Sequence, residues 1–333
     1  MTRIPSLDYM KLMMAIGVAY AHAILFQDLT KVAHYTVVWE FLVGNAVLRS
    51  FVPTFSVLSG YFLYITHKRG RARRWILELL VAYVFWIAFY LPIWGRDVAG
   101  WGDALWIVCF GPVHLWYVSG LILSGFVLVM LLRLCQRYGL GLWPIMVLAV
   151  VLALSGSAAA YWSFLGRHNI PLEVVRNGLT VVFPFAVVGY AIGRFVDARG
   201  REALPSARRL WTWTGVMFAL KTAEAVFAMR YGLTASTLPE LPLMAYPAAI
   251  LLFLSFLRTD LPASRQNLSL WSVSIYFLHI FVFVVLHRFG VENIAVSVLA
   301  GTLIPIALAL GYERITMRTS RRSTRERVAD KPS

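Results

Sequence analysis

The stretch from Leu7 to Phe26, LDYMKLMMAIGVAYAHAILF, is a run of 20 mostly apolar residues, the length that a helix needs to cross a bilayer. It contains Lys11 and His22, whose side chains are costly to place in hydrocarbon. Eleven helical steps of about 100° bring these two side chains to within about 20° of each other, roughly 16 Å apart along the axis. The stretch therefore predicts a membrane-spanning helix that presents a polar stripe to a helix bundle.

The rest of the chain has the composition of a membrane protein. Of its 333 residues, 59% are hydrophobic and 14% are charged, whereas a soluble domain carries about 25% charged residues. Apolar runs of near-spanning length recur along the whole chain, so we expect an all-α, polytopic protein with about ten transmembrane helices. The expected spans are 7–27, 41–66, 75–94, 113–133, 142–162, 176–196, 210–229, 241–257, 268–288 and 293–315.

Lysine and arginine divide unevenly between the two sets of alternate loops. The set that includes both termini holds 22 of the 31 basic residues, and the other set holds five. Basic loops stay in the cytoplasm, so both termini are expected there, and topology accounts for the net charge of +15. The expected organisation is one transmembrane domain, 1–315, followed by a basic cytoplasmic tail, 316–333.

The sequence contains no motif that indicates several other classes of function. The basic tail could bind RNA or anionic lipid, but since topology already explains the charge we expect contact with membrane lipid and no nucleic acid. Cys109 and Cys135 fall near opposite ends of the fourth span and cannot form a disulfide on this topology. The sequence contains no zinc-like Cys/His spacing, nucleotide-binding glycine loop or nucleophile elbow, so we expect no bound metal or cofactor.

The first two spans carry polar groups with two interpretations each. Asp8 lies three residues before Lys11, so the pair could anchor the first span at the interface, or Lys11 could act on a substrate. The second span contains Arg49, Pro53 and the pair Ser59–Gly60. These favour either a kink for helix packing or a kink that opens a cavity with Arg49 as an anion-binding group.

Histidines recur on two later spans. His114 lies at the outer end of the fourth span, at an expected depth similar to that of His22, and Trp116 beside it suits an interfacial aromatic belt. Tyr276 and His279 are three positions apart on the ninth span and share a helix face. An imidazole inside a membrane bundle is suited to proton transfer.

Two further pairs predict packing and neutralisation. Lys221 and Glu224 are spaced for a local ion pair, so we expect them to neutralise each other. Gly189 and Gly193 form a small-xxx-small pattern, which predicts close contact with another helix.

Together these segments resemble the acyltransferase 3 family of integral membrane acyltransferases, and the resemblance runs over essentially the whole chain. Lys11 and His22 match the family's opening of arginine, ten residues and histidine, with lysine in place of arginine. The second-span pattern of the family is matched by Arg49, Val52, Pro53, Phe55, Ser59 and Gly60, while Thr54 and Ser56 depart from it. Later motifs are similar at His114–Tyr117, at Phe183–Gly193 and at Tyr276–His279.

The resemblance implies transfer of an acyl group from cytoplasmic acyl-coenzyme A to a hydroxyl of an exopolysaccharide, O-antigen or other envelope glycan, some of them lipid-linked. It also implies a bacterial inner membrane location. Acetyl-coenzyme A is the expected donor; a succinyl donor stays open, because Arg176 could bind its extra carboxylate.

Thioester-to-alcohol transfer needs a base for the hydroxyl proton and donors for the oxyanion. We expect His22 to be the general base or a transient acyl carrier, and Lys11 and the Lys68–Arg74 loop to bind the phosphates of coenzyme A. Arg49, His114 and Tyr276 are expected to orient the acceptor or to stabilise developing charge. The full set of candidates is His22, His114, Tyr276 and His279 for catalysis, and Lys11, Arg49, Ser59 and Trp116 for donor or substrate binding.

A polar path through a bundle also fits transport. The alternative function is therefore a transporter or flippase for a lipid-linked glycan or acyl substrate. A structural assembly subunit ranks third, because it leaves the aligned motifs without a role.

Overall fold

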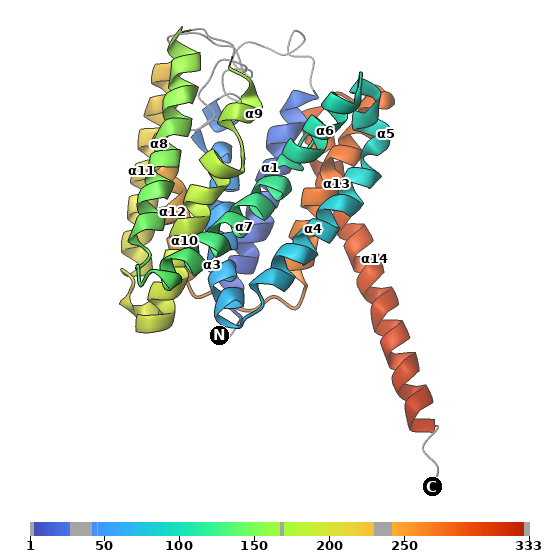
Figure 1. The fold of residues 1–333 in the computed structure, drawn as a ribbon. Helices are drawn as coiled ribbons and strands as arrows, with labels where there is room; N and C mark the ends of the chain where they lie inside the picture. The colour runs from blue at the N-terminus through green and yellow to red at the C-terminus, as the bar shows by residue number, and fades with distance from the viewer. Residues whose placement is uncertain (1–2, 27–41, 45, 167–169, 230–241, 330–333) are drawn as a thin grey trace. The chain divides into compact units, whose positions relative to one another are not determined.

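The computed structural model describes residues 3–26, 42–44, 46–166, 170–229 and 242–329. Within these ranges every regular element is helical and no strand is present (Figure 1), which confirms the all-α class. The described residues form two compact units, one within 1–7 and 32–261 and the other within 8–31 and 262–333.

The first unit contains most of the helices. Its long helices are α3 (Phe51–Lys68), α4 (Ala72–Phe89), α7 (Trp116–Arg137), α8 (Trp143–Gly166), α10 (Phe183–Arg199), α11 (Ala207–Met229) and α12 (Ala245–Arg258). Its short elements are η2 (Leu48–Ser50), α5 (Leu91–Trp94), η3 (Gly95–Asp97), α6 (Trp101–Phe110), α9 (Leu172–Val175), the π-helical turn η4 (Gly178–Val182) and η5 (Arg201–Ala203).

The second unit consists of nearly all of α1 (Pro5–Leu25), α13 (Leu268–Arg288) and α14 (Ile294–Ala329). The last two helices pack closely, because Gly301 lets α14 approach the ring of Phe283, where a Cβ would lie 2.4 Å from a ring carbon. α14 continues beyond residue 315, so the backbone of the basic tail is helical as far as Ala329.

Among the residues that the structure describes, six helices are long and apolar enough to cross a membrane, and each coincides with a predicted span. They are Leu42–Lys68, Trp116–Arg137, Trp143–Ser163, Gly178–Arg199, Leu268–Arg288 and Ile294–Thr316. The other four predicted spans also fall on helices, namely α1, α4, α11 and α12, which are shorter or carry more ionisable residues. The protein is a multi-pass membrane protein, while the count of ten spans and the orientation stay predictions.

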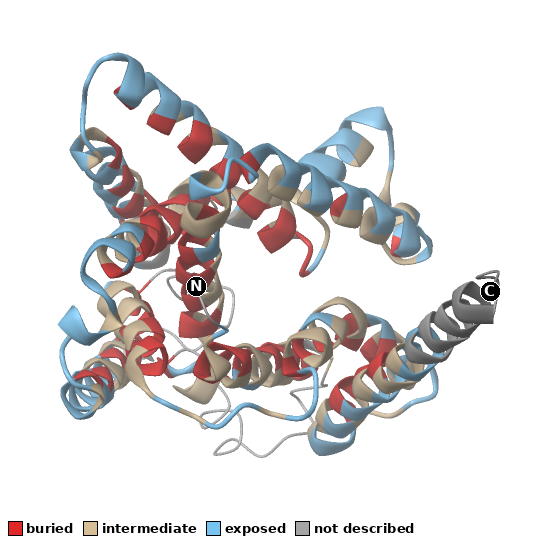
Figure 2. Cartoon of the chain, turned by 90° about the horizontal axis from the view of Figure 1, so that it is seen from below, coloured by how far each residue is buried: buried red, intermediate tan, exposed pale blue. Residues whose placement is uncertain are grey.

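The outer face of α8 shows why such helices need lipid. Val147, Val150, Val151 and Leu154 are each more than half exposed, and their spacing places them on one face of the helix. Figure 2 shows the same alternation of buried and exposed residues along the helices. A continuous apolar face is unfavourable in water but suits hydrocarbon.

α3 and α10 pack backbone against backbone. A Cβ on Gly60 would lie 1.9 Å from the carbonyl oxygen of Ala186, and a Cβ on Gly189 would lie 1.9 Å from that of Val57. Gly193 lies in the same interface, so the predicted small-residue contact is confirmed. Tyr64 and Lys68 at the end of α3 both bond Asp197 near the end of α10, so the two helices run parallel.

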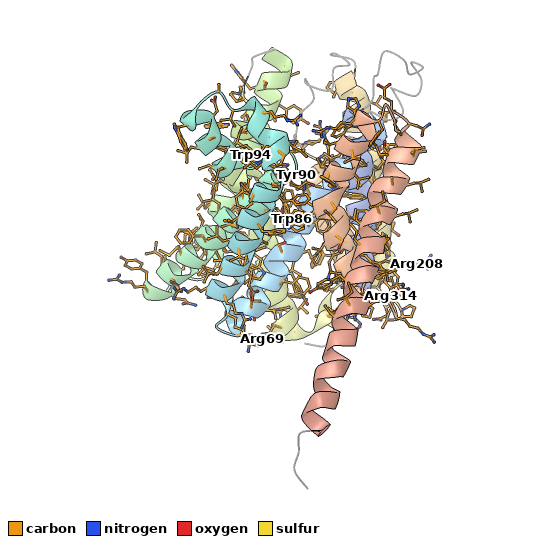
Figure 3. The ribbon with its side chains drawn as sticks, turned by 90° about the vertical axis from the view of Figure 1, so that its right-hand side faces the viewer. Arg69, Trp86, Tyr90, Trp94, Arg208 and Arg314 are labelled. Carbon is orange, nitrogen blue, oxygen red and sulfur yellow. The ribbon has the colours of Figure 1, made fainter. Side chains whose placement is uncertain are left out.

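The two ends of α4 differ in chemistry. Arg69 precedes the helix, whereas Trp86, Tyr90 and Trp94 occupy its later turns and the turn beyond it (Figure 3). This distribution is typical of a helix that starts on the cytoplasmic side and ends in an interfacial aromatic belt.

One local prediction needs correction. The second span is not kinked at Pro53, because this proline lies in the first turn of α3, where its missing N–H removes no helical hydrogen bond. The interruption is instead the 3-10 turn η2, which contains Arg49. The helix α6 lies outside the predicted spans, and its ten residues are indeed too few to cross a bilayer.

Candidate active site

Two of the predicted histidines meet in the second unit. His22 lies near the end of α1 and His279 lies in α13, and these helices are side by side (Figure 1). His22 Nδ1 and His279 Nε2 are 3.0 Å apart, and the ring centroids are separated by 5.0 Å. His279 is fully buried, and its Nδ1 lies 2.8 Å from the carbonyl oxygen of Ile275.

These contacts determine where the hydrogens lie. A carbonyl oxygen only accepts hydrogen bonds, so Nδ1 of His279 carries a hydrogen and donates it to Ile275. In the neutral ring Nε2 of His279 is then an acceptor, and Nδ1 of His22 must be the donor to it. His22 consequently has its lone pair on Nε2. This is the tautomer that a general base needs, held in place by a second imidazole.

Two phenylalanine rings lie beside the histidine pair within the second unit. Phe283 follows His279 by one helical turn and contacts it edge-on, with ring centroids 5.6 Å apart. Phe26 packs against Phe283 from the end of α1 at 5.7 Å. Apolar walls lower the local dielectric constant, which strengthens the hydrogen bonds that orient the rings.

A second contact joins the same helices near their other ends. Lys11 Nζ donates to Asp8 Oδ1 and to Ser269 Oγ, both at 2.7 Å, and Ser269 Oγ donates to Asp8 Oδ1 at 2.6 Å. The predicted pairing of Asp8 with Lys11 is thus confirmed and is extended by a serine of α13. Asp8 compensates the charge of Lys11 in this arrangement.

The two contacts together fix the direction of the helices. Ser269 and His279 meet residues of α1 in the same order along the chain, so α1 and α13 run parallel. Parallel first and ninth spans require an odd number of crossings between them, and the ten-span prediction places seven there. The predicted stripe is also confirmed, since Lys11 and His22 both contact α13.

Tyr276 lies on α13 three residues before His279. Its side chain is half-buried, and its ring packs edge-on against Phe277 at 4.9 Å.

In the first unit, Ser59 of α3 contacts the start of α7. Its hydroxyl lies 3.1 Å from that of Tyr117, whose ring also packs near Phe55, with centroids 6.4 Å apart. The structure therefore brings together the serine of the second-span motif and the tyrosine of the His-Leu-Trp-Tyr motif.

His114 and Trp116 of the same motif have an aromatic and a cationic neighbour, respectively. His114 is buried, and its ring meets that of Tyr90 edge-on at 5.2 Å. The guanidinium carbon of Arg176 lies 5.0 Å from the ring centroid of Trp116, in cation–π geometry. Arg176 is thus beside a predicted substrate-binding residue.

Unusual backbone surrounds this motif. Val113 has a φ of 48° and is the single non-glycine residue with positive φ within the described ranges. Such a conformation is strained for a β-branched residue, and strain of this kind clusters at functional sites. Asn177, next to Arg176, caps the π-helical turn η4 through the backbone N–H groups of Leu179 and Thr180. π-Helical turns are likewise frequent at functional sites.

Lys221 and Glu224 do not form the expected ion pair. Lys221 Nζ donates to Ser50 Oγ at 2.7 Å. Glu224 accepts the backbone N–H groups of Leu243 and Met244 at 2.7 and 3.0 Å, and also the hydroxyl of Tyr161. The prediction was wrong because Glu224 caps the start of α12, a partner that spacing within α11 cannot reveal.

The predicted residues divide evenly between the two units. Lys11, His22, Tyr276 and His279 lie in the second unit, and Arg49, Ser59, His114 and Trp116 lie in the first. Sequence reasoning missed Ser269 as a partner of Lys11. A signal for it existed, because Ser269 precedes His279 by ten residues, close to the spacing of eleven between Lys11 and His22.

Cys109 and Cys135 are both free, as expected. No group of three or more His, Cys, Asp or Glu side chains in the described ranges is placed to hold a metal ion.

Comparison with known proteins bears on the chain as a whole. A family model described as an acyltransferase domain matches residues 4–313. No curated protein and no solved structure matches the chain. The family match includes all eight predicted site residues and covers nearly the whole sequence. The chain therefore belongs to the acyltransferase 3 family and is a multi-pass membrane protein of the acyltransferase type.

Proposed function

We propose that this protein is an O-acyltransferase of the bacterial inner membrane. It would cross the membrane ten times, with both termini in the cytoplasm. The acyl group, acetyl or alternatively succinyl, would come from cytoplasmic acyl-coenzyme A and pass to a hydroxyl of an exopolysaccharide, O-antigen or other envelope glycan. Membership of the acyltransferase 3 family supports the reaction class.

The observation that carries the proposal is the histidine pair. Nε2 of His22 would take the proton of the acceptor hydroxyl while the oxygen attacks the thioester carbonyl carbon. The positive charge that forms on His22 is stabilised through its hydrogen bond to His279 Nε2, 3.0 Å away. His279 acts as a positioning residue, because its own orientation is fixed by Ile275.

The second half of the reaction returns the proton. The carbon–sulfur bond breaks as the new ester forms, and the leaving thiolate takes the proton from the His22 imidazolium. The products are the glycan ester and free coenzyme A thiol, with His22 neutral again. If His22 instead carried the acyl group, the same carbon–sulfur bond would break first and the acceptor would attack an acyl-imidazole.

Binding groups for the donor and acceptor complete the proposal. Lys11 lies eleven residues before His22, roughly 16 Å along α1, on the side assigned to the cytoplasm. Lys11 and the Lys68–Arg74 loop would bind the phosphates of coenzyme A. Arg49, Ser59, His114, Trp116 and Tyr276 would orient the acceptor or stabilise the oxyanion.

The test is mass analysis of surface and secreted glycans from cells that lack the gene, complemented with wild type, His22→Ala or His287→Ala. His287 is the matched control, because it lies on α13 and contacts Phe26, the residue that follows α1, but belongs to neither end of the polar stripe. We expect one ester-linked acyl group to disappear without the gene and to return with wild type and His287→Ala alone.

A second readout separates catalysis from transport. Purified wild-type protein should release free thiol from acetyl-coenzyme A in the presence of the acceptor, and His22→Ala should not. Unchanged acylation together with altered amounts of exported glycan would instead support a transporter or flippase.

A further inference from the structure

Lys221 is a fully buried lysine outside the histidine site. It lies in α11, thirteen positions after Arg208, which is roughly 20 Å along the helix axis. Its side chain has no exposed surface. A lysine at the interface can extend its ammonium group into water, but Lys221 at this depth cannot. Its charge must therefore be compensated inside the protein or by a bound group.

The described residues supply that compensation only in part, because Glu224 acts electrostatically on Lys221 while no carboxylate among them pairs directly with its ammonium group. Ser50 Oγ, at 2.7 Å from Nζ, is the single hydrogen-bond acceptor of Lys221 among them, and none of their carboxylates lies within 4.0 Å. Glu224, one helical turn away, is occupied by the start of α12 and by Tyr161. A neutral serine oxygen stabilises an ammonium group far less than a carboxylate does.

The neighbouring charge increases the imbalance. Arg49 precedes Ser50 in η2 and is close enough to act electrostatically on Lys221. Lys221 has three N–H donors and Ser50 has one O–H donor, and a single hydrogen bond joins the two side chains. Two cations and a buried hydroxyl thus lie near one another, and the ammonium group of Lys221 has a single hydrogen-bond acceptor among the described residues. Removing a charge from water is unfavourable unless the charge is paired.

We propose that Lys221, Ser50 and Arg49 form a binding site for one oxyanion, a carboxylate or a phosphate group. The oxyanion accepts from the ammonium and the hydroxyl, lies beside the guanidinium and gives Lys221 a directly paired countercharge. Arg49 is half-buried whereas the other two side chains are buried, so the anion enters along Arg49. Its source is either a small acidic group, such as the carboxylate of an acidic sugar, or the phosphate of a lipid headgroup.

The competing explanation is a neutral lysine that merely fills space. The two explanations differ in the effect of removing the amine. A structural neutral amine makes stability independent of the anion, and replacing it by methionine is then harmless or stabilising. An anion site makes stability rise with anion concentration, by about 1.4 kcal/mol for each tenfold increase above the dissociation constant.

The experiment uses the full-length purified protein in a neutral detergent and needs no enzymatic activity, so its outcome is independent of the proposed acyl transfer. Thermal unfolding is followed at constant ionic strength while chloride is replaced by acetate or by inorganic phosphate. A separate arm compares mixed micelles that contain phosphatidic acid with micelles that contain phosphatidylcholine. Stabilisation by acetate or inorganic phosphate identifies a small acidic group, and stabilisation by phosphatidic acid alone identifies a lipid phosphate.

The variants are Lys221→Met, Ser50→Ala and, as a matched control, Arg137→Met, which removes an exposed cation at the end of α7. We expect the melting temperature of wild type and of Arg137→Met to rise with oxyanion concentration. Lys221→Met should lose this response. Ser50→Ala, which keeps both charges, should show a weaker response even if Lys221→Met does not fold. A wild-type melting temperature that is the same in all anions, or a response that survives in Ser50→Ala at full size, would overturn the proposal.

Discussion

The contact between α3 and α10 allows a sharp test of how this protein is held together. Gly189 of α10 faces the carbonyl oxygen of Val57, and a Cβ there would lie 1.9 Å from that oxygen. In Gly189→Ala the methyl group cannot rotate away, because it is attached to the backbone, and the oxygen it meets also belongs to the backbone. The two helices must therefore separate.

The expected magnitude follows from the geometry. An ordinary contact begins near 3.4 Å, so the helices must part locally by about 1.5 Å. Overpacking costs about 1–3 kcal/mol, and a rigid backbone contact belongs at the upper end of this range. The higher helix propensity of alanine offsets up to about 1 kcal/mol of this cost. We expect a net loss of about 2 kcal/mol in the free energy of unfolding.

The control is the same substitution where space is available. Gly215 in α11 is exposed, and a Cβ there would meet nothing within 4 Å. Gly215→Ala should therefore be neutral or stabilising by up to about 1 kcal/mol. The measurement is unfolding of the purified protein in mixed micelles with increasing SDS, followed by far-ultraviolet circular dichroism.

Two results would refute this reasoning. One is equal stability of Gly189→Ala and Gly215→Ala, since they share the propensity change and differ in the clash alone. The other is additivity in the double variant Gly60→Ala/Gly189→Ala. Both glycines lie in one interface, so once the helices have parted the second methyl group should cost less than the first.

Three further predictions concern polar contacts. His279→Ala should lower kcat for acyl transfer by about 100-fold or more with little change in KM for the donor, because His22 loses the partner that orients it; an unchanged kcat in steady-state kinetics would exclude this role. Ser269→Ala should lower the free energy of unfolding by about 1 kcal/mol through the lost hydrogen bond to Asp8, and SDS unfolding that matches wild type would contradict it. Glu224→Ala should lower the free energy of unfolding by about 1–2 kcal/mol, because the start of α12 loses its acceptor. Glu224→Gln keeps a carbonyl acceptor and should lose less. Equal losses for the two variants in the same unfolding assay would argue against capping.

The sequence predicted the helices well, because hydrophobic length is a local property. Each expected span coincides with a helix, and Gly189 and Gly193 mark a helix contact as predicted. Spacing within one helix also placed Lys11 and His22 on the same stripe. These features depend on residues that are near one another in the chain.

The sequence could not predict contacts between distant segments. His22 and His279 were both candidates, but their hydrogen bond joins residues 257 positions apart. The error at Glu224 has the same origin, because its partner is the start of the next helix rather than a residue of its own helix. The predicted kink at Pro53 was wrong because the 3-10 turn η2 precedes α3. Pro53 therefore lies at the beginning of a helix and not inside one.

The pairing of α1 with α13 also has a consequence in time. The ribosome completes His22 early and His279 only 257 residues later, an interval of roughly 13 to 50 s at the usual rates of synthesis. During this interval α1 lacks the helix that completes its polar stripe. Asp8 and Lys11 are neighbours on one helical turn, so their charges can pair at once, while His22 must wait for its partner. The hydrogen bond between His22 and His279 can therefore form only late in biogenesis, after α13 has been synthesised.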